Sequence, residues 1–490
     1  MATKEQQVKN SFIYLLPVIV GNLLPLLTLP IFTRILTKED YGALALAQVY
    51  GIFMSGIANF GLILGYERNF FEHKDEKKAA ELLYSTLLFV IATFLICLIF
   101  TYLFKSPLSK WIIGSSNQAD LLFWAFCSTG TMNLKIYYLT YFKNMENAKP
   151  FVWYTIDESV LGVVLSLFLV VYMRVGVVGL VWGQLLARLV IFSILAFRFI
   201  KILPILFNFK ILKSSLMLSY PLTPSILFKV VGTQFDKYMI GLLASIGGVG
   251  IYSIGQKIAN IVFTYMTAIE NVFSPQVYRR MFDLGEKGGE AVGRYLTPFV
   301  YVSISIALMI SLFAEEIITI LTPSSFHGAI DIVIILSMLY GSYFFGKQPQ
   351  LLFAKKTYIS SALTLTRIAL NVAINIPFIM KWGALGAAYG MLTAGLISGS
   401  VHFIVSQHYY RIEWQYRTIL LIFLIFFGSS LLMILSRYYM LDYTVRLFIK
   451  FTAILAYLYL GIKIKVISAD NLSVIKNIIY SKVPFSMRYH

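Results

Sequence analysis

Residues 229–257 read KVVGTQFDKYMIGLLASIGGVGIYSIGQK, and this stretch lies inside two runs that are long and apolar enough to cross a bilayer. It carries four charged side chains at membrane depth, Lys229, Asp236, Lys237 and Lys257. Each such charge costs about 2.5–3.5 kcal/mol at the centre of a membrane helix. We therefore expect a polar cavity among the helices that these side chains face.

The composition around this stretch is that of a membrane protein with many spans. Of 490 residues, 58% are hydrophobic and 13% are charged, which is more apolar surface than a soluble core can bury. An all-α polytopic membrane protein with about fourteen transmembrane helices is predicted. The expected spans are 11–33, 42–66, 80–104, 119–142, 151–173, 177–197, 217–244, 250–273, 296–314, 328–346, 357–380, 385–408, 418–436 and 443–462.

The net charge of +18 has a topological explanation. Most Lys and Arg residues fall in alternate connections between the predicted spans, and these are the cytoplasmic ones if the N-terminus lies inside. This bias predicts a multi-pass protein with both termini in the cytoplasm. It also removes the reason to invoke nucleic acid as a partner.

The sequence contains an internal repeat. MRVGVVGLVWGQLLARL (173–189) matches MKWGALGAAYGMLTAGL (380–396) at an offset of 207 residues (380 − 173), with three glycines in register. We predict two pseudo-symmetric lobes of six helices in the same orientation, with the glycines allowing close helix packing. The predicted division is an N-lobe at 1–200, a cytoplasmic amphipathic linker at 201–216, a C-lobe at 217–410, and two further helices with a cytoplasmic tail at 411–490.

Both predicted lobes place polar side chains at membrane depth, and basic ones outnumber acidic ones. The candidate substrate-cavity residues are Lys135, Arg188, Lys229, Lys257, Arg367, Asn371 and Asn375. The candidate ion-coupling residues are Asp157, Glu158, Asp236 and Glu270. For any single residue a structural role is equally plausible, for example in a neutralising pair such as Asp236 with Lys237 or Arg188 with Asp157.

Other chemistries find little support in the sequence. A phosphate-binding GxxxxGK[ST] loop and an HExxH metal motif are both absent. The acidic pair Glu315–Glu316 is explained by a solvated helix end. We therefore predict no catalytic residue, no metal site and no cofactor, and a protein that is not an enzyme.

Three blocks of sequence resemble the Wzx-type polysaccharide and O-antigen flippases of the MOP (multidrug/oligosaccharidyl-lipid/polysaccharide) superfamily. The opening block is LPIFTRILTKEDYGALALA (29–47). The middle block is YPLTPSILFKVVGTQFDKYMIGLLASIGGVGIYSIGQKI (220–258), followed by FSPQVYRRM (273–281). The late block is NVAINIPFIMKWGALGAAYG (371–390).

The resemblance implies a MATE-like arrangement of two lobes around a V-shaped cavity in the bacterial plasma (inner) membrane. It implies that undecaprenyl-diphosphate-linked glycan repeat units of O-antigen, capsule or exopolysaccharide move from the cytoplasmic to the outer leaflet by alternating access. Membrane lipids, H⁺ or Na⁺, and the polymerase and chain-length proteins of the same pathway are the implied partners. Two alternatives stay open, namely a MATE-like drug or metabolite antiporter and a membrane polysaccharide polymerase or glycosyltransferase.

Overall fold

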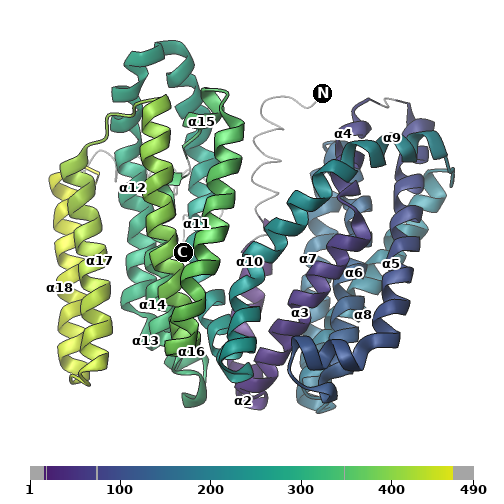
Figure 1. Cartoon of the computed structure of the whole chain (residues 1–490), viewed down its shortest axis with the longest axis horizontal. Helices are drawn as coiled ribbons and strands as arrows, with labels where there is room; N and C mark the ends of the chain where they lie inside the picture. Colours follow the sequence, from purple (N-terminus) through teal and green to yellow (C-terminus); the bar gives the residue numbers. More distant parts are fainter. Residues whose placement is uncertain (1–15, 18, 73–74, 347, 467–490) are drawn as a thin grey trace, which may run out of the picture. The chain divides into compact units, whose positions relative to one another are not determined.

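The computed structural model describes residues 16–17, 19–72, 75–346 and 348–466, without the side chains of Lys229, Val272 and Glu286. Every regular element in these ranges is a helix (Figure 1). The first helices are α2 (Leu29–Ile35), α3 (Lys38–Asn59), α4 (Leu62–Phe70), α5 (Glu76–Ile112), η1 (Ser116–Gln118), α6 (Ala119–Asn144), α7 (Ala148–Leu167), η2 (Phe168–Tyr172), α8 (Val177–Ile202), α9 (Phe209–Ser219), η3 (Tyr220–Leu222) and α10 (Thr223–Leu243). The later helices are α11 (Ile246–Leu284), η4 (Gly285–Lys287), α12 (Gly288–Leu312), α13 (Ala314–Leu321), η5 (Ser324–Phe326), α14 (Ala329–Ser342), η6 (Tyr343–Gly346), α15 (Gln350–Phe353), α16 (Thr357–Tyr409), α17 (Tyr416–Tyr438) and α18 (Tyr443–Lys463).

The chain divides into two compact units. Unit 1 holds the residues up to 254 together with 318–328 and 378–387. Unit 2 holds 255–317, 329–377 and the residues from 388 onward.

Long apolar helices are the expected outcome of this composition, because a helix satisfies all its backbone polar groups internally where no water is available. Eight of the described helices are long and apolar enough to cross a membrane. The predicted all-α, multi-span fold is therefore confirmed, whereas the count of fourteen spans stays a prediction. The predicted division into lobes and linker also stays a prediction.

The beginning of α3 is set by local chemistry. Thr37 accepts a hydrogen bond from the backbone N–H of Asp40 at 3.1 Å, and the Asp40 carboxylate accepts one from the backbone N–H of Thr37 at 2.9 Å. This reciprocal capping box satisfies two free N–H groups. The helix ends where Phe60 and Gly61 adopt left-handed conformations (φ 51° and 65°), so the predicted span 42–66 is in fact divided between α3 and α4.

The first glycine of the repeat adopts the same backbone conformation in both copies. Gly176 precedes α8 with φ 74° and ψ −152°, and Gly383 breaks α16 with φ 58° and ψ −133°. Residues with a side chain avoid this region. Further along each copy, a methyl group at Gly183 would collide with the backbone of Ser166, and one at Gly390 would collide with Asn375. The expected packing role of these glycines agrees with these close approaches.

The segment predicted as the amphipathic linker, 201–216, contains the beginning of α9. α8 extends to Ile202, and α9 starts only after Asn208, whose side chain accepts hydrogen bonds from the N–H groups of Lys210 and Ile211. α9 packs against α4 and α5. In this contact Asn69 donates a hydrogen bond to Ser215 at 2.9 Å, and both side chains are buried.

An ion-pair cluster in unit 2 joins α13 to α18. The side chain of Lys450 is fully buried and pairs with Glu316, which also accepts a hydrogen bond from Tyr443 at 2.8 Å. Glu315 and Glu316 keep only 15% and 23% of their side-chain surface exposed. The expectation that this acidic pair is a solvated helix end is therefore wrong, because the basic residues of α17 and α18 cover it.

Two arginines extend this cluster to α14 and α17. Arg437 lies 2.8 Å from Asp331 and 3.5 Å from Glu315, and Arg446 lies 3.2 Å from Glu315. The α13–α18 cluster thus balances three acidic side chains with three basic ones. Figure 1 shows α17 and α18 beside α12, where Tyr301 and Tyr457 stack at 4.5 Å and each donates a hydrogen bond to the backbone of the other.

We expect Gly183→Ala to destabilise the protein by about 1–3 kcal/mol, because the added methyl group overpacks the α7–α8 contact. The matched control is Gly162→Ala in the same helix pair, where the nearest atoms would lie at ordinary contact distances of 3.6 and 3.8 Å. Thermal melting of the detergent-purified protein, followed by size-exclusion chromatography, measures the difference. Equal melting of the two variants would contradict the close approach.

A second prediction concerns acid stability. Burial by itself raises the pKa of Glu316, but hydrogen bonds from Lys450 and Tyr443 outweigh burial and lower this pKa below its ordinary value. A carboxyl with a lowered pKa stabilises the folded state above its unfolded pKa of about 4.3, and this stability is lost as the pH falls through the folded value. The melting temperature of the wild type should therefore fall more steeply below about pH 5 than that of Glu316→Gln. Identical pH profiles would show that the cluster does not depend on this charge.

Candidate functional site

Three of the sequence-predicted residues meet inside unit 1, each from a different helix. Lys135 of α6 forms an ion pair with Glu158 of α7, and the Nε of Arg188 on α8 lies 3.5 Å from Glu158. The three side chains keep 5%, 13% and 17% of their surface exposed, respectively. Arg188 also donates a hydrogen bond to Ser128 at 2.6 Å. We call Lys135, Glu158 and Arg188 the triad.

The triad arises because α6, α7 and α8 pack against one another. With all three side chains ionised, two positive charges and one negative charge give the triad a formal net charge of +1. Such a site attracts anions, and the planar guanidinium of an arginine suits a phosphate oxygen pair. The triad therefore combines a structural ion pair with one positive charge that the carboxylate does not balance.

The neighbouring carboxylates Asp157 and Glu158 have different environments. Asp157 is exposed, whereas Glu158 is held between Lys135 and Arg188. The pairing of Arg188 with Asp157 that the sequence left open does not occur, because Glu158 takes that position. The two predicted coupling residues are therefore not equivalent.

The charged residues of α10 lie in unit 1 as well. Asp236 is 2% exposed, and Lys237 donates a hydrogen bond to Gln234 at 3.3 Å. α10 packs against α3. Lys229 belongs to α10, but its side chain lies outside the described part of the structure.

The candidates of unit 2 are more dispersed. Lys257 on α11 and Arg367 on α16 are exposed. Asn375 is fully buried and donates a hydrogen bond to Asn371 at 2.7 Å. Of the three candidates on α16, Asn371 and Asn375 thus contact each other, and Arg367 is exposed.

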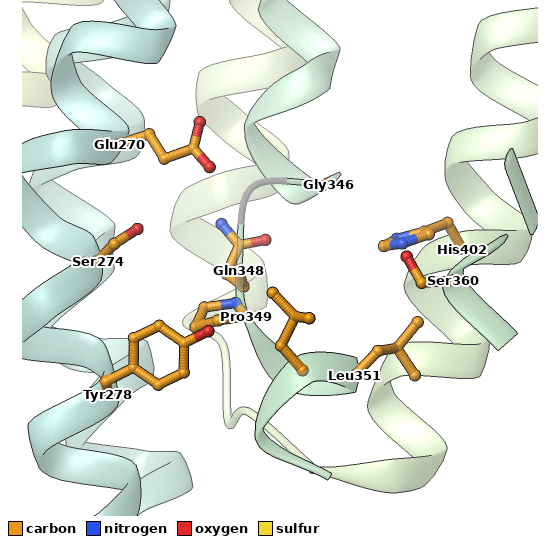
Figure 2. Close-up of a pocket in the computed structure, with 10 residues that line it drawn as sticks. Glu270, Ser274, Tyr278, Gly346, Gln348, Pro349, Leu351, Ser360 and His402 are labelled. Atoms are coloured by element: carbon orange, nitrogen blue, oxygen red, sulfur yellow. The ribbon is translucent and has the colours of Figure 1, made fainter. Parts of the chain in front are cut away.

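A cavity of about 300 Å³ lies within unit 2 and is lined by Glu270, which the sequence identified, and by residues that it did not. Figure 2 shows one wall formed by Glu270, Ser274 and Tyr278 of α11, and another that includes Ser360 and His402 of α16. Gln348, in the segment before α15, lies between these walls. The spacing of the three α11 residues, four apart along one helix face, is a sequence signal that would have found this wall.

Two buried polar atoms of this cavity have no hydrogen-bond partner within the described residues, Nδ1 of His402 and Oε1 of Gln348. The Gln348 side chain is 7% exposed, and its amide nitrogen donates to the carbonyl of Phe344 at 2.7 Å. Among the described residues, no group of three or more His, Cys, Asp or Glu side chains is placed to hold a metal ion. The cavity is therefore a polar recess with free hydrogen-bonding capacity.

Comparison with known proteins identifies the sequence family of the chain. The sequence pattern of a family described as "Polysaccharide biosynthesis protein" matches residues 7–277, more than half of the chain. No protein of curated function matches the sequence significantly.

Several solved structures share the fold. A lipid II flippase MurJ in an inward closed conformation has a TM-score of 0.66 and 16% identity, over 93% of this chain and 98% of that chain. An inward-facing multidrug resistance MATE family transporter of the MOP superfamily has a TM-score of 0.62 and 17% identity, over 80% and 97%. The Vibrio cholerae MATE transporter VcmN has a TM-score of 0.55 and 16% identity, over 82% and 96%. At these identities the likeness shows the fold alone, which this chain shares with the flippase and transporter structures named here.

We expect Glu158→Gln to destabilise the protein by about 3–5 kcal/mol, because it leaves Lys135 and Arg188 buried without their opposite charge. The adjacent variant Asp157→Asn makes the same chemical change on an exposed side chain, and should change stability by less than about 0.5 kcal/mol. The yield of monodisperse protein and its melting temperature compare the two variants. If Asp157→Asn were the more harmful one, the assignment of the ion pair would be wrong.

Proposed function

This chain belongs to the polysaccharide biosynthesis protein family, and from this premise we propose that it is a flippase for lipid-linked oligosaccharides. In this proposal an undecaprenyl-diphosphate-linked glycan repeat unit, of O-antigen, capsule or exopolysaccharide, crosses from the cytoplasmic to the outer leaflet of the bacterial inner membrane. The likeness in fold to the lipid II flippase MurJ supports a lipid-linked substrate.

The observation that carries the proposal is the triad. A transporter of a lipid diphosphate has to attract an anion into a membrane environment, where an isolated cation would be costly. Glu158 compensates one of two cations and leaves a net positive charge among α6, α7 and α8. Arg188, with 17% of its side chain exposed, is the member that we assign to the phosphate oxygens.

The other candidates keep their predicted roles within this proposal. The proposed cations of the substrate cavity are Lys135, Lys229, Lys257 and Arg367. The proposed polar residues of its wall are Asn371 and Asn375. The proposed coupling residues for H⁺ or Na⁺ are Asp157, Glu158, Asp236 and Glu270. Protonation of Glu158 would release two cations at once, which gives a physical route from a proton gradient to the affinity for an anion.

A second candidate function is a multidrug or metabolite antiporter, which the likeness in fold to MATE family transporters supports. A net positive triad suits an anionic substrate and gives no advantage in transporting a cationic or neutral one. The third possibility, a membrane polymerase or glycosyltransferase, requires catalytic side chains on a sizeable outer loop, which the sequence lacks. We therefore favour the flippase.

The test is a strain that lacks the gene. We expect it to lose its surface glycan and to accumulate lipid-linked repeat units that an added membrane-impermeant glycosidase cannot reach. Wild-type protein should restore the glycan, and Arg188→Gln should restore less than about one tenth of it, because a lost charge-assisted hydrogen bond costs about 1.5–3 kcal/mol. Unchanged surface glycan together with new drug sensitivity in the deletion strain would favour the antiporter instead.

A further inference from the structure

The cavity of unit 2 has a chemistry different from that of the triad. Its polar groups are one carboxylate, Glu270, the amide of Gln348, the imidazole of His402, and the hydroxyls of Ser274, Tyr278 and Ser360. The apolar part of its lining includes Pro349, Leu351 and Leu352. Small-molecule sites combine an apolar lining with a few convergent polar groups in this way.

We propose that this cavity binds one sugar ring of the transported glycan. Sugar hydroxyls both donate and accept hydrogen bonds. One hydroxyl can donate to Oε1 of Gln348. Another can donate to Nδ1 of His402 or accept from it, depending on which nitrogen of the imidazole carries the proton. Oε1 of Gln348 and Nδ1 of His402 are the two buried atoms of this cavity that have no partner within the described residues. The apolar face of a pyranose ring has Tyr278 and Pro349 available for packing.

Other ligands fit the cavity less well. A bare metal ion needs several carboxylate, imidazole or thiolate ligands, whereas this lining offers one carboxylate and one imidazole. An anion such as a phosphate would meet the carboxylate of Glu270. The volume of about 300 Å³ lies at the lower end of the range of ligand pockets, roughly 300–1,000 Å³, which suits a single ring rather than an oligosaccharide.

That the sugar belongs to a transported glycan rests on the proposed function. The cavity of unit 2 would then select the glycan, whereas the triad of unit 1 would bind the diphosphate of the lipid carrier. Gln348 and His402 come from distant parts of the chain, before α15 and within α16, and meet Glu270 only in the folded unit (Figure 2). Substitutions in this lining are then expected to change which glycan is accepted. Substitutions in the triad are expected to weaken transport of every glycan.

Saturation-transfer NMR on the full chain in nanodiscs tests the proposal with free glucose, N-acetylglucosamine, rhamnose and glucuronic acid as probes. We expect at least one probe to bind in the millimolar range. Gln348→Ala should weaken that binding at least tenfold. Tyr278→Phe and Ser274→Ala, which remove only a hydroxyl, should weaken it severalfold while the melting temperature stays unchanged.

The matched control is Gln276→Ala, which makes the same change at an exposed position of α11 that does not line the cavity. It should bind as the wild type does. Absence of binding for all four probes, or equal binding by Gln348→Ala and Gln276→Ala, would overturn the sugar site and leave the flippase proposal intact. Binding that depends on the cavity would support the site even if the deletion strain kept its surface glycan, which is the result that would overturn the flippase.

Discussion

A charge buried among membrane helices needs an opposite charge within reach, and this requirement acts in both units of the structure. In unit 1, Glu158 compensates Lys135 and Arg188. In unit 2, the fully buried Lys450 meets Glu316. Removing one partner from such a pair leaves the other uncompensated, which costs far more than the pair contributes. The helices that carry these charges are therefore held to specific neighbours, as apolar packing alone would not hold them.

The fold was largely predictable because its determinants are local. Apolar stretches of about 20 residues encode helices that cross a bilayer, and the glycine repeat predicted close helix packing that the structure has at Gly183 and Gly390. The differences from expectation are local too. Phe60 and Gly61, both in the left-handed conformation, separate α3 from α4. This break could not be predicted from hydropathy, because the two residues and their neighbours are as apolar as the rest of the span.

The pairing of charges was not predictable from the sequence, because it depends on which helices touch. Glu158 and Asp157 are adjacent in the chain and equal in chemistry, yet the rotation of α7 directs only Glu158 towards Lys135. The basic side chains that cover Glu315 and Glu316 lie more than a hundred residues later in the chain. The lining of the unit 2 cavity was missed for the same reason, although the spacing of Glu270, Ser274 and Tyr278 was visible.

Gly176 and Gly383 share a backbone conformation that side chains resist. After a gene segment doubles, most positions of the two copies are free to drift apart, since an apolar residue of one kind replaces another at little cost. A position that tolerates no side chain cannot drift. If the predicted repeat reflects a duplication, the two glycines are the positions that change least, and they offer an anchor for aligning the halves of distant relatives whose remaining residues no longer agree.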